Sequence, residues 1–191
     1  MSVIPSNAKK VFSGVIFDVY QWEQKMYDGS TQLFERLDRN DTVDVLATTN
    51  GSKILLERQS QPDREESFLC LIGGRVEKDE DILEAAKREM LEETGYASED
   101  WSLLLSHRPM FKIRWDMHVF VARTCEKTSQ QQLDPGERIE IIEVSFDAFL
   151  ELIDSGEMHR IHDEVRSRCI RAKYHRPSYE ALYREIFGKK P

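Results

Sequence analysis

The chain has 191 residues, of which 40% are hydrophobic and 32% are charged. A chain of this length forms one domain, or one domain with an appendage. With 27 lysine and arginine residues against 35 aspartate and glutamate residues, its formal net charge is −8 at pH 7, which argues against a general nucleic-acid partner. No apolar run approaches the roughly 20 residues of a membrane-spanning helix, so we also expect no membrane partner.

The first residues and the cysteines indicate the compartment. Residues 1–10 are mostly polar, include Pro5 and lack the apolar stretch of a secretory signal. The three cysteines, Cys70, Cys125 and Cys169, are widely spaced, and no pair has the C-x2-C spacing of a zinc site. We therefore expect a cytoplasmic protein whose cysteines are buried, small hydrophobic residues.

Two β-hairpins are predicted in the first 60 residues, because in each a turn dipeptide separates two runs rich in β-forming residues. The turn dipeptides are Asp28-Gly29 and Asn50-Gly51. The expected strand regions are residues 11–26, 32–38, 42–48 and 53–58.

A helix is predicted in the middle of the chain. A strand over residues 68–72 ends at Gly73-Gly74, after which the hydrophobic period changes from about 2 to about 3.6 residues. This change predicts a helix over residues 81–94, and Gly95 is suited to its left-handed C-cap.

The second half of the chain is predicted to contain strands followed by helices. A polar loop is expected over residues 130–136, and the expected strands are residues 101–106, 111–122 and 139–144. Ser145 is a suitable N-cap for a helix over residues 146–154 that stops at Gly156, and Pro177 is well placed to open a final helix ending near Gly188.

Three carboxylates lie on one face of the predicted central helix. Glu89, Glu92 and Glu93 are spaced at i, i+3 and i+4, so they share a single turn and repel one another. A solvated acidic face is one explanation of this spacing. The other is that a counter-charge such as Arg88, or bound divalent cations, compensates the repulsion.

The wider pattern around these carboxylates distinguishes the two explanations. It reads Gly74, five residues, Glu80, seven residues, Arg88-Glu89-Met90, one residue, Glu92-Glu93, one residue, Gly95-Tyr96. This pattern resembles the Nudix hydrolase signature at every fixed position, although the signature covers only residues 74–96. The resemblance implies an α/β fold, namely a Nudix-type α/β/α sandwich with a mixed β-sheet, to which an N-terminal β-hairpin subdomain is added.

The resemblance also implies a role for each signature residue in a site that binds Mg²⁺ or Mn²⁺. Glu89 and Glu93 would be the main metal ligands, Glu92 a direct or water-bridged ligand that takes part in catalysis, and the Gly73 carbonyl a backbone ligand. Arg88 would orient a glutamate, and Glu80 would fix the loop to the helix. Gly74 and Gly95 would be structural. Hard cations prefer such oxygen ligands, and they lower the pKa of bound water for attack on phosphorus.

The general base is less clearly marked. The segment Leu133-Asp134-Pro135-Gly136-Glu137 resembles the carboxylate-bearing loop of the ADP-ribose pyrophosphatases of this family. By this resemblance Glu137 is a further metal ligand or the base, and Asp134 is the second candidate. An exposed turn with incidental acidic residues is the alternative.

Features outside the signature resemble the same branch. They are the N-terminal hairpin, the Gln59-x-Gln61-Pro62 stretch and the helix over residues 146–156. The resemblance implies that residues 1–40 form a dimerising β subdomain attached to a Nudix domain over residues 41–191, and that the protein is a homodimer. It also makes Tyr20, Trp22 and Arg58 candidate substrate contacts, although an aromatic residue at strand spacing also suits a core. One departure is Ile72, which stands where many members have a small residue or proline.

The resemblance implies a hydrolase that cleaves the diphosphate of a nucleoside diphosphate linked to another moiety, and ADP-ribose, giving AMP and ribose 5-phosphate, is the first candidate. A nucleotide sugar such as GDP-mannose is the second, and dinucleoside polyphosphates, NADH and oxidised nucleotides are further alternatives. A noncatalytic nucleotide sensor on the same scaffold is the alternative from another class. Such sensors usually lose signature carboxylates, and here Glu89, Glu92 and Glu93 are all present.

Overall fold

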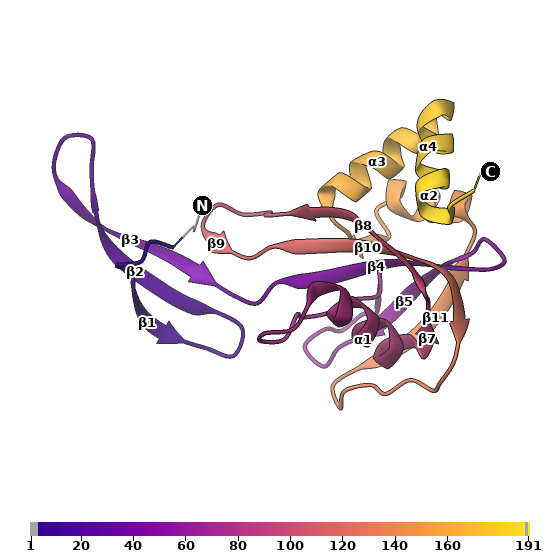
Figure 1. Ribbon diagram of the computed structural model, residues 1–191, viewed down its shortest axis with the longest axis horizontal. Helices are drawn as coiled ribbons and strands as arrows, with labels where there is room; N and C mark the ends of the chain where they lie inside the picture. The colour runs from indigo at the N-terminus through magenta and orange to yellow at the C-terminus, as the bar shows by residue number, and fades with distance from the viewer. Residues whose placement is uncertain (1–3, 190) are drawn as a thin grey trace.

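The computed structural model describes residues 4–189 and 191. Two layers of helices enclose strands of a mixed β-sheet, and a second, smaller sheet projects from one end (Figure 1). The helices are α1 (Ile82–Thr94), α2 (Phe146–Asp154), α3 (Asp163–Tyr174) and α4 (Arg176–Phe187). The strands are β1 (Lys9–Ser13), β2 (Asp18–Lys25), β3 (Thr31–Asp38), β4 (Thr42–Thr49), β5 (Ile54–Ser60), β6 (Phe68–Cys70), β7 (Tyr96–Ala97), β8 (Asp100–His107), β9 (Ile113–Arg114), β10 (Met117–Lys127), β11 (Arg138–Val144) and β12 (Met158–Arg160).

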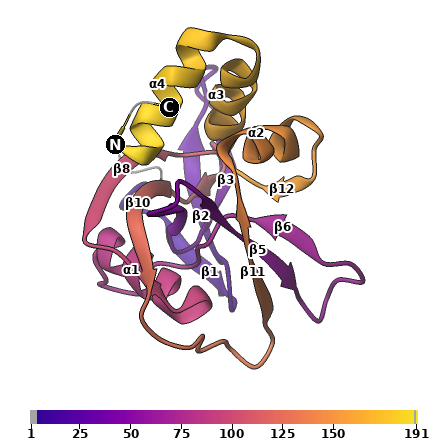
Figure 2. The same ribbon diagram turned by 90° about the vertical axis from the view of Figure 1, so that its right-hand side faces the viewer.

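Strands β4 and β10 form the centre of the large sheet and pair in parallel. Because side chains alternate along a strand, β4 and β10 contribute side chains to two separate cores, one on each face of the sheet. Val45 and Phe120 pack toward α1, whereas Leu46 and Val121 pack toward α2, α3 and α4. Figure 2 shows α1 on one side of the strands and the other three helices on the opposite side. The α/β/α sandwich expected from the sequence is therefore confirmed.

Helix α1 begins and ends where local sequence signals predict. The side chain of Asp81 accepts hydrogen bonds from the first turn, and Gly95 takes a left-handed conformation with φ +74° while its amide donates to Leu91 O at 2.8 Å. The buried face of the helix contains Ala85, Ala86 and Met90, as expected, but also Glu93 and Thr94. The buried Glu93 connects α1 to the candidate site, because its side chain accepts a hydrogen bond from the Gly73 amide.

The opposite layer is held by an aromatic cluster at the start of α2. Phe146 lies against Tyr179, Tyr183 and Phe187 of α4, with ring centroids 4.9, 5.3 and 5.9 Å apart. The helices α2 and α4 agree with the predicted ranges, including the Ser145 N-cap. Helix α3 was not assigned a range from the sequence, because its exposed face is densely charged.

The β4–β5 hairpin is joined only near its turn, where Ala47 and Thr48 pair with Leu55 and Ile54. Beyond these pairs the two strands diverge, β4 toward β10 and β5 toward β6 and β11. The chain after β6 crosses this gap and forms single bridges to β4, with Ile72 opposite Val45 and Arg75 opposite Thr42. Gly73 and Gly74 thereby lie over the opening between the diverging strands.

The N-terminal sheet has the order β1-β2-β3-β9. The hairpin around Asp28-Gly29 is present as β2 and β3, which pair from Asp18↔Asp38 to Lys25↔Thr31. Its fourth strand, β9, comes from the segment before β10, so residues 1–40 do not form this sheet alone. The division of domains at residue 40 stays a prediction.

Several predicted strands differ in extent from those observed. The region 11–26 divides into β1 and β2, the region 111–122 divides into β9 and β10, and the strand predicted over residues 68–72 ends at Cys70.

All three cysteines are buried and free, as expected. Among the described residues, no helix has both the length and the apolar character needed to cross a membrane.

Replacement of Gly95 tests how tightly the end of α1 is held. Gly95→Ala is expected to lower the free energy of unfolding by about 3 kcal/mol, because a left-handed alanine costs about 1–2 kcal/mol and its added atom forces a backbone shift. That Cβ would lie 2.3 Å from Ser129 O. Urea denaturation measures the change. Gly29→Ala is the matched control, since Gly29 has φ +83° and nothing within 4 Å of such a Cβ. Equal losses for the two variants would contradict this account.

Candidate active site

Glu93 is the innermost carboxylate of α1, with only 4% of its surface exposed. Its Oε2 accepts a hydrogen bond from the Gly73 amide at 3.0 Å. Gly73 has φ +153°, and a Cβ there would lie 2.1 Å from Val43 O. The turn therefore reaches both β4 and Glu93 only because this residue is glycine.

Gly74 provides a second close approach to the helix. A Cβ on this residue would lie 2.3 Å from the carboxylate carbon of Glu89. Backbone amides of β4 donate to Ile72 O at 2.8 Å and to Gly74 O at 3.0 Å. Within the described residues, no hydrogen bond to the intervening Gly73 carbonyl is found, which suits the backbone ligand that the sequence resemblance implies.

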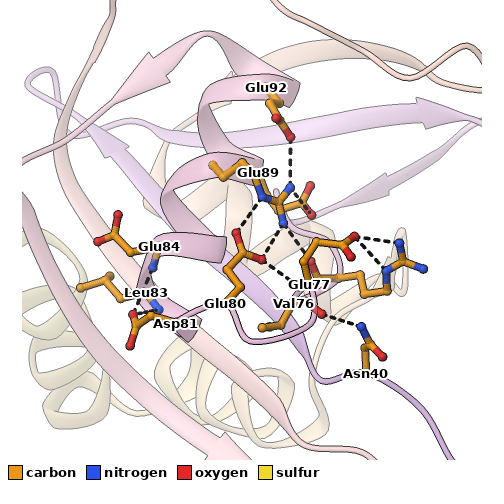
Figure 3. A network of polar contacts seen from close by, with 11 residues as sticks. Asn40, Val76, Glu77, Glu80, Asp81, Leu83, Glu84, Glu89 and Glu92 are labelled. Atoms are coloured by element: carbon orange, nitrogen blue, oxygen red, sulfur yellow. Dashed lines mark hydrogen bonds and ion pairs between the residues drawn. The ribbon is translucent and has the colours of Figure 1, made fainter.

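On the exposed side of the same turn, Arg88 connects the acidic residues (Figure 3). Its guanidinium donates to Glu80 Oε1 at 2.8 Å, to Glu89 Oε1 at 3.0 Å and to Glu92 Oε2 at 3.1 Å. It also donates to the Arg75 carbonyl at 3.0 Å. The hydrogen bond from Arg88 lowers the pKa of Glu80. Arg88 and Glu80 thus lie where the resemblance places them, and their roles in catalysis stay predictions.

A further carboxylate, Glu57 on β5, faces α1 from the sheet. Glu57 is 1% exposed, and its side chain lies within hydrogen-bonding reach of Glu93. Its Oε1 has no hydrogen-bond partner among the described residues, while the Cys70 thiol lies 4.0 Å from Oε2. Burial raises the pKa of both Glu57 and Glu93, and neighbouring carboxylates add to the effect.

The loop before β11 brings Glu137 toward this cluster. Gln131 Nε2 donates to Glu93 O at 2.6 Å, and the Gln132 amide donates to Glu92 O at 2.7 Å, so the loop is fastened to the end of α1. The negative charge of Glu137 contributes to the raised pKa values of Glu57, Glu89 and Glu93. Asp134 is exposed, and its amide lies 3.4 Å from Glu137 Oε2. The role of Glu137 as a further metal ligand or as the base, with Asp134 as the second candidate, stays a prediction.

The donors present fit a hard divalent cation. All of them are oxygens, and the unpartnered, buried Oε1 of Glu57 has no counter-charge beside it. In the described part of the chain, no three acidic, histidine or cysteine side chains already converge on one point.

A cavity of about 490 Å³ adjoins the glycine turn. Its walls come from the turn, β4, the segments around β8 and β9, and the chain after β12. They include Arg39, Asp44, Gly73, Gly74, Arg75, His107, Trp115, Arg160 and His162. The Arg39 guanidinium lies 4.6 Å from the centre of the Trp115 ring. Burial raises the pKa of Asp44 to about 7, and the charge of Arg160 opposes this shift.

The three substrate contacts expected in the first 60 residues lie elsewhere in the single chain. Trp22 packs on Phe34 within the N-terminal sheet, and the Tyr20 ring lies 5.6 Å from Lys10 Nζ. Arg58 forms an ion pair with Glu140 on the exposed face of β5 and β11. None of the three lines the cavity beside the glycine turn. Their assignment as substrate contacts stays a prediction.

Two carboxylates of this region were missed from the sequence. Glu57 directly follows the apolar run Ile54-Leu55-Leu56 within β5, and Asp44 interrupts the run from Val43 to Ala47. A single acid within a buried strand signals a functional position, because a buried charge is costly without a partner. This signal was available, but the identity of its partners depends on how distant strands pair.

The site combines the Gly73-Gly74 turn, several carboxylates and an adjoining cavity that contains arginines. This combination is typical of hydrolases that act on diphosphates with a divalent cation. The model of the NUDIX domain family matches residues 38–168, which is more than half of the chain. The chain therefore belongs to the Nudix family, and it is a Nudix hydrolase.

Two curated relatives and one solved structure are among the proteins similar to the chain. It is 29% identical to the "ADP-ribose pyrophosphatase" of Bacillus subtilis (strain 168), and 30% identical to the "Methanol dehydrogenase activator" of Bacillus methanolicus. Each match spans 79% of this chain and 83% of the relative. A crystal structure of an "ADP compounds hydrolase" superposes with a TM-score of 0.71, covering 87% of this chain and 90% of that one. At 19% identity, this likeness supports the fold alone.

The raised pKa values of the buried acids predict how pH affects the metal-free protein. The neutral forms of these acids stabilise the folded state, and this contribution is complete below the carboxyl pKa of the unfolded chain, about 4.3. The contribution is lost as pH rises through the pKa values of the folded state, which for Glu93 is about 8. In EDTA, the free energy of unfolding should therefore fall by more than about 1 kcal/mol between about pH 5 and pH 9. Urea denaturation at both pH values measures this change. The free energy of unfolding of Glu93→Gln should fall less over the same pH range. An equal fall in the variant and in wild type would contradict the raised pKa of Glu93.

Proposed function

We propose that the chain hydrolyses the diphosphate of a nucleoside diphosphate linked to another moiety, with ADP-ribose as substrate and Mg²⁺ or Mn²⁺ as cofactor. The products would be AMP and ribose 5-phosphate. The observation that carries this proposal is that Gly73 and Gly74 contact Glu93 and Glu89 and also line the cavity. The name of the Bacillus subtilis relative supports the choice of ADP-ribose.

The cavity suits the organic part of such a substrate. A volume of about 490 Å³ falls in the usual range for small-molecule sites. Arg39 and Arg160 offer planar, permanently charged donors for phosphate oxygens, and Trp115 offers an aromatic surface for a base. Asp44 would accept hydrogen bonds from ribose hydroxyls.

In the proposed reaction, Glu89 and Glu93 would hold the cation, assisted by Glu92 and the Gly73 carbonyl. When bound, the ion would supply positive charge to the diphosphate and lower the pKa of nearby water. Glu137 would take a proton from the attacking water as the water oxygen forms its bond to phosphorus. The bond between phosphorus and the bridging oxygen breaks, and the bridging oxygen leaves with the electron pair. Arg88 would keep Glu89 oriented throughout.

Two alternatives use the same scaffold. A nucleotide sugar such as GDP-mannose shares the diphosphate but has a different base and sugar. A noncatalytic sensor would bind the ligand without turnover, and the complete set of signature carboxylates argues against this role. The Bacillus methanolicus relative has a name that concerns the activation of another enzyme, so similarity at this level does not select the substrate.

We also propose that the chain is a cytoplasmic homodimer that associates through its N-terminal sheet. This sheet extends away from the helices (Figure 1), and it exposes apolar side chains. They are Val11, Phe12 and Leu33, together with Val15 and Ile16 in the connecting turn. Burial of these side chains at an interface would stabilise a dimer. Sedimentation velocity should give twice the 22.4 kDa mass of the chain. A monomer mass at all concentrations would contradict the proposal.

Glu93→Gln tests the hydrolase directly. The variant keeps an oxygen to accept the Gly73 hydrogen bond but loses the charge that would hold the cation, so kcat should fall by at least about a hundredfold. The assay follows product formation with Mg²⁺ from ADP-ribose, GDP-mannose, NADH and a dinucleoside polyphosphate. ADP-ribose should give the highest kcat/KM.

The matched control is Glu84→Gln, which removes an exposed acid from the same helix and should keep wild-type turnover. Arg160→Ala should mainly raise KM, because it removes a substrate contact outside the cluster. If wild type and Glu93→Gln give the same background on every substrate, the hydrolase proposal fails and the sensor gains support.

A further inference from the structure

The acidic cluster extends beyond the helix that carries the signature. Along β5, Leu55 packs into the core beneath α1, and Glu57, two residues later, points to the same side of the sheet. It lies opposite Cys70 of β6 in the strand register. Glu57 and Glu93 thus meet from the two walls of the space between sheet and helix, within reach of one hydrogen bond.

The buried side of this pair has no described positive partner. Arg88 directs its donors to Glu80, Glu89, Glu92 and the Arg75 carbonyl, and none of these hydrogen bonds goes to Glu57 or Glu93. Arg58, next to Glu57 along β5, points to the opposite face, where it pairs with Glu140. The Cys70 thiol offers Glu57 at most a weak hydrogen bond.

An unpartnered carboxylate oxygen in such a place is costly. Glu57 is 1% exposed, and its Oε1 has no hydrogen-bond donor among the described residues. A glutamine or an apolar residue of similar size would fill the same space without the penalty of bringing two acids together. A cation between the two carboxylates would remove the repulsion and satisfy the free oxygen.

We propose that Glu57 is a ligand of the divalent cation, contributed by the sheet, in addition to the carboxylates of α1. This inference rests on the proposed metal-dependent function. Since Glu57 belongs to β5 and Glu93 to α1, the ion would join the sheet to the helix through oxygens of both elements. Cation binding would then stabilise the packing of α1 as well as prepare the site for substrate.

Glu57→Gln separates this role from a purely structural one, because the amide keeps the shape and a hydrogen-bond donor for Glu93 but loses the charge. Binding of Mn²⁺ alone, without nucleotide, is followed by the electron paramagnetic resonance signal of the free ion. Glu57→Gln should weaken Mn²⁺ binding at least about tenfold. Its metal-free melting temperature should equal or exceed that of wild type, while the increase caused by Mn²⁺ should shrink.

Two further variants complete the test. Glu140→Gln, an exposed acid on the neighbouring strand β11, should bind Mn²⁺ like wild type. Glu57→Asp keeps the charge on a shorter side chain and should bind Mn²⁺ more tightly than Glu57→Gln, which gives a second comparison if the amide variant folds poorly.

The outcomes also separate this inference from the proposed function. If Glu93→Gln loses Mn²⁺ binding but Glu57→Gln keeps the wild-type dissociation constant, the helix site stands and Glu57 is not a ligand. A metal-free Glu57→Gln that melts well below wild type, with unchanged Mn²⁺ affinity, assigns Glu57 a structural role and overturns the proposal. If wild type itself binds no Mn²⁺, both proposals fail.

Discussion

The hydrogen bond from the Gly73 amide to Glu93 is the contact on which the arrangement of the site depends. It joins the turn after β6 to the buried face of α1 with an N to Oε2 distance of 3.0 Å. Both partners are unusual at their positions. Gly73 passes beside Val43 O, where a side chain would not fit, and Glu93 is an acidic residue on the inner face of a helix, where an apolar residue is expected. Because a buried carboxylate needs donors, the bond also fixes where the helix lies relative to the turn.

Charge is distributed unevenly around α1. On the exposed side, Arg88 balances three carboxylates with a network of hydrogen bonds. On the buried side, Glu57 and Glu93 face each other with only neutral donors among the described residues. Such an arrangement lowers the free energy of unfolding in the absence of an ion. Active sites commonly contain arrangements that are needed for function but destabilise the fold. The fold tolerates it because Ala85, Ala86 and Met90 on the inner face of α1 pack into an apolar core.

The features predicted from the sequence are those that depend on neighbouring residues. Caps such as Gly95 and Ser145 act within one turn, so their positions could be predicted, and the signature predicted the acidic face of α1. The partners of Glu57 depend on how β5 pairs with β6 and packs beneath α1, which no local pattern encodes. The bounds of helix α3 were not predicted for another reason: its charged outer face hides the narrow buried stripe of Val165, Cys169 and Ala172.

The divergence of β4 and β5 explains why the cluster and the cavity adjoin. A hairpin paired along its whole length would close the sheet, and the chain after β6 would have no gap to cross. Because pairing stops at Ala47 and Thr48, Gly73 and Gly74 fill the opening as half-buried backbone, with carboxylates on one side and the cavity with Arg39 and Arg160 on the other. In the proposed function, a diphosphate lying across these two glycines would meet the cation on one side and the arginines on the other. Backbone without side chains is the only covering that leaves both accessible.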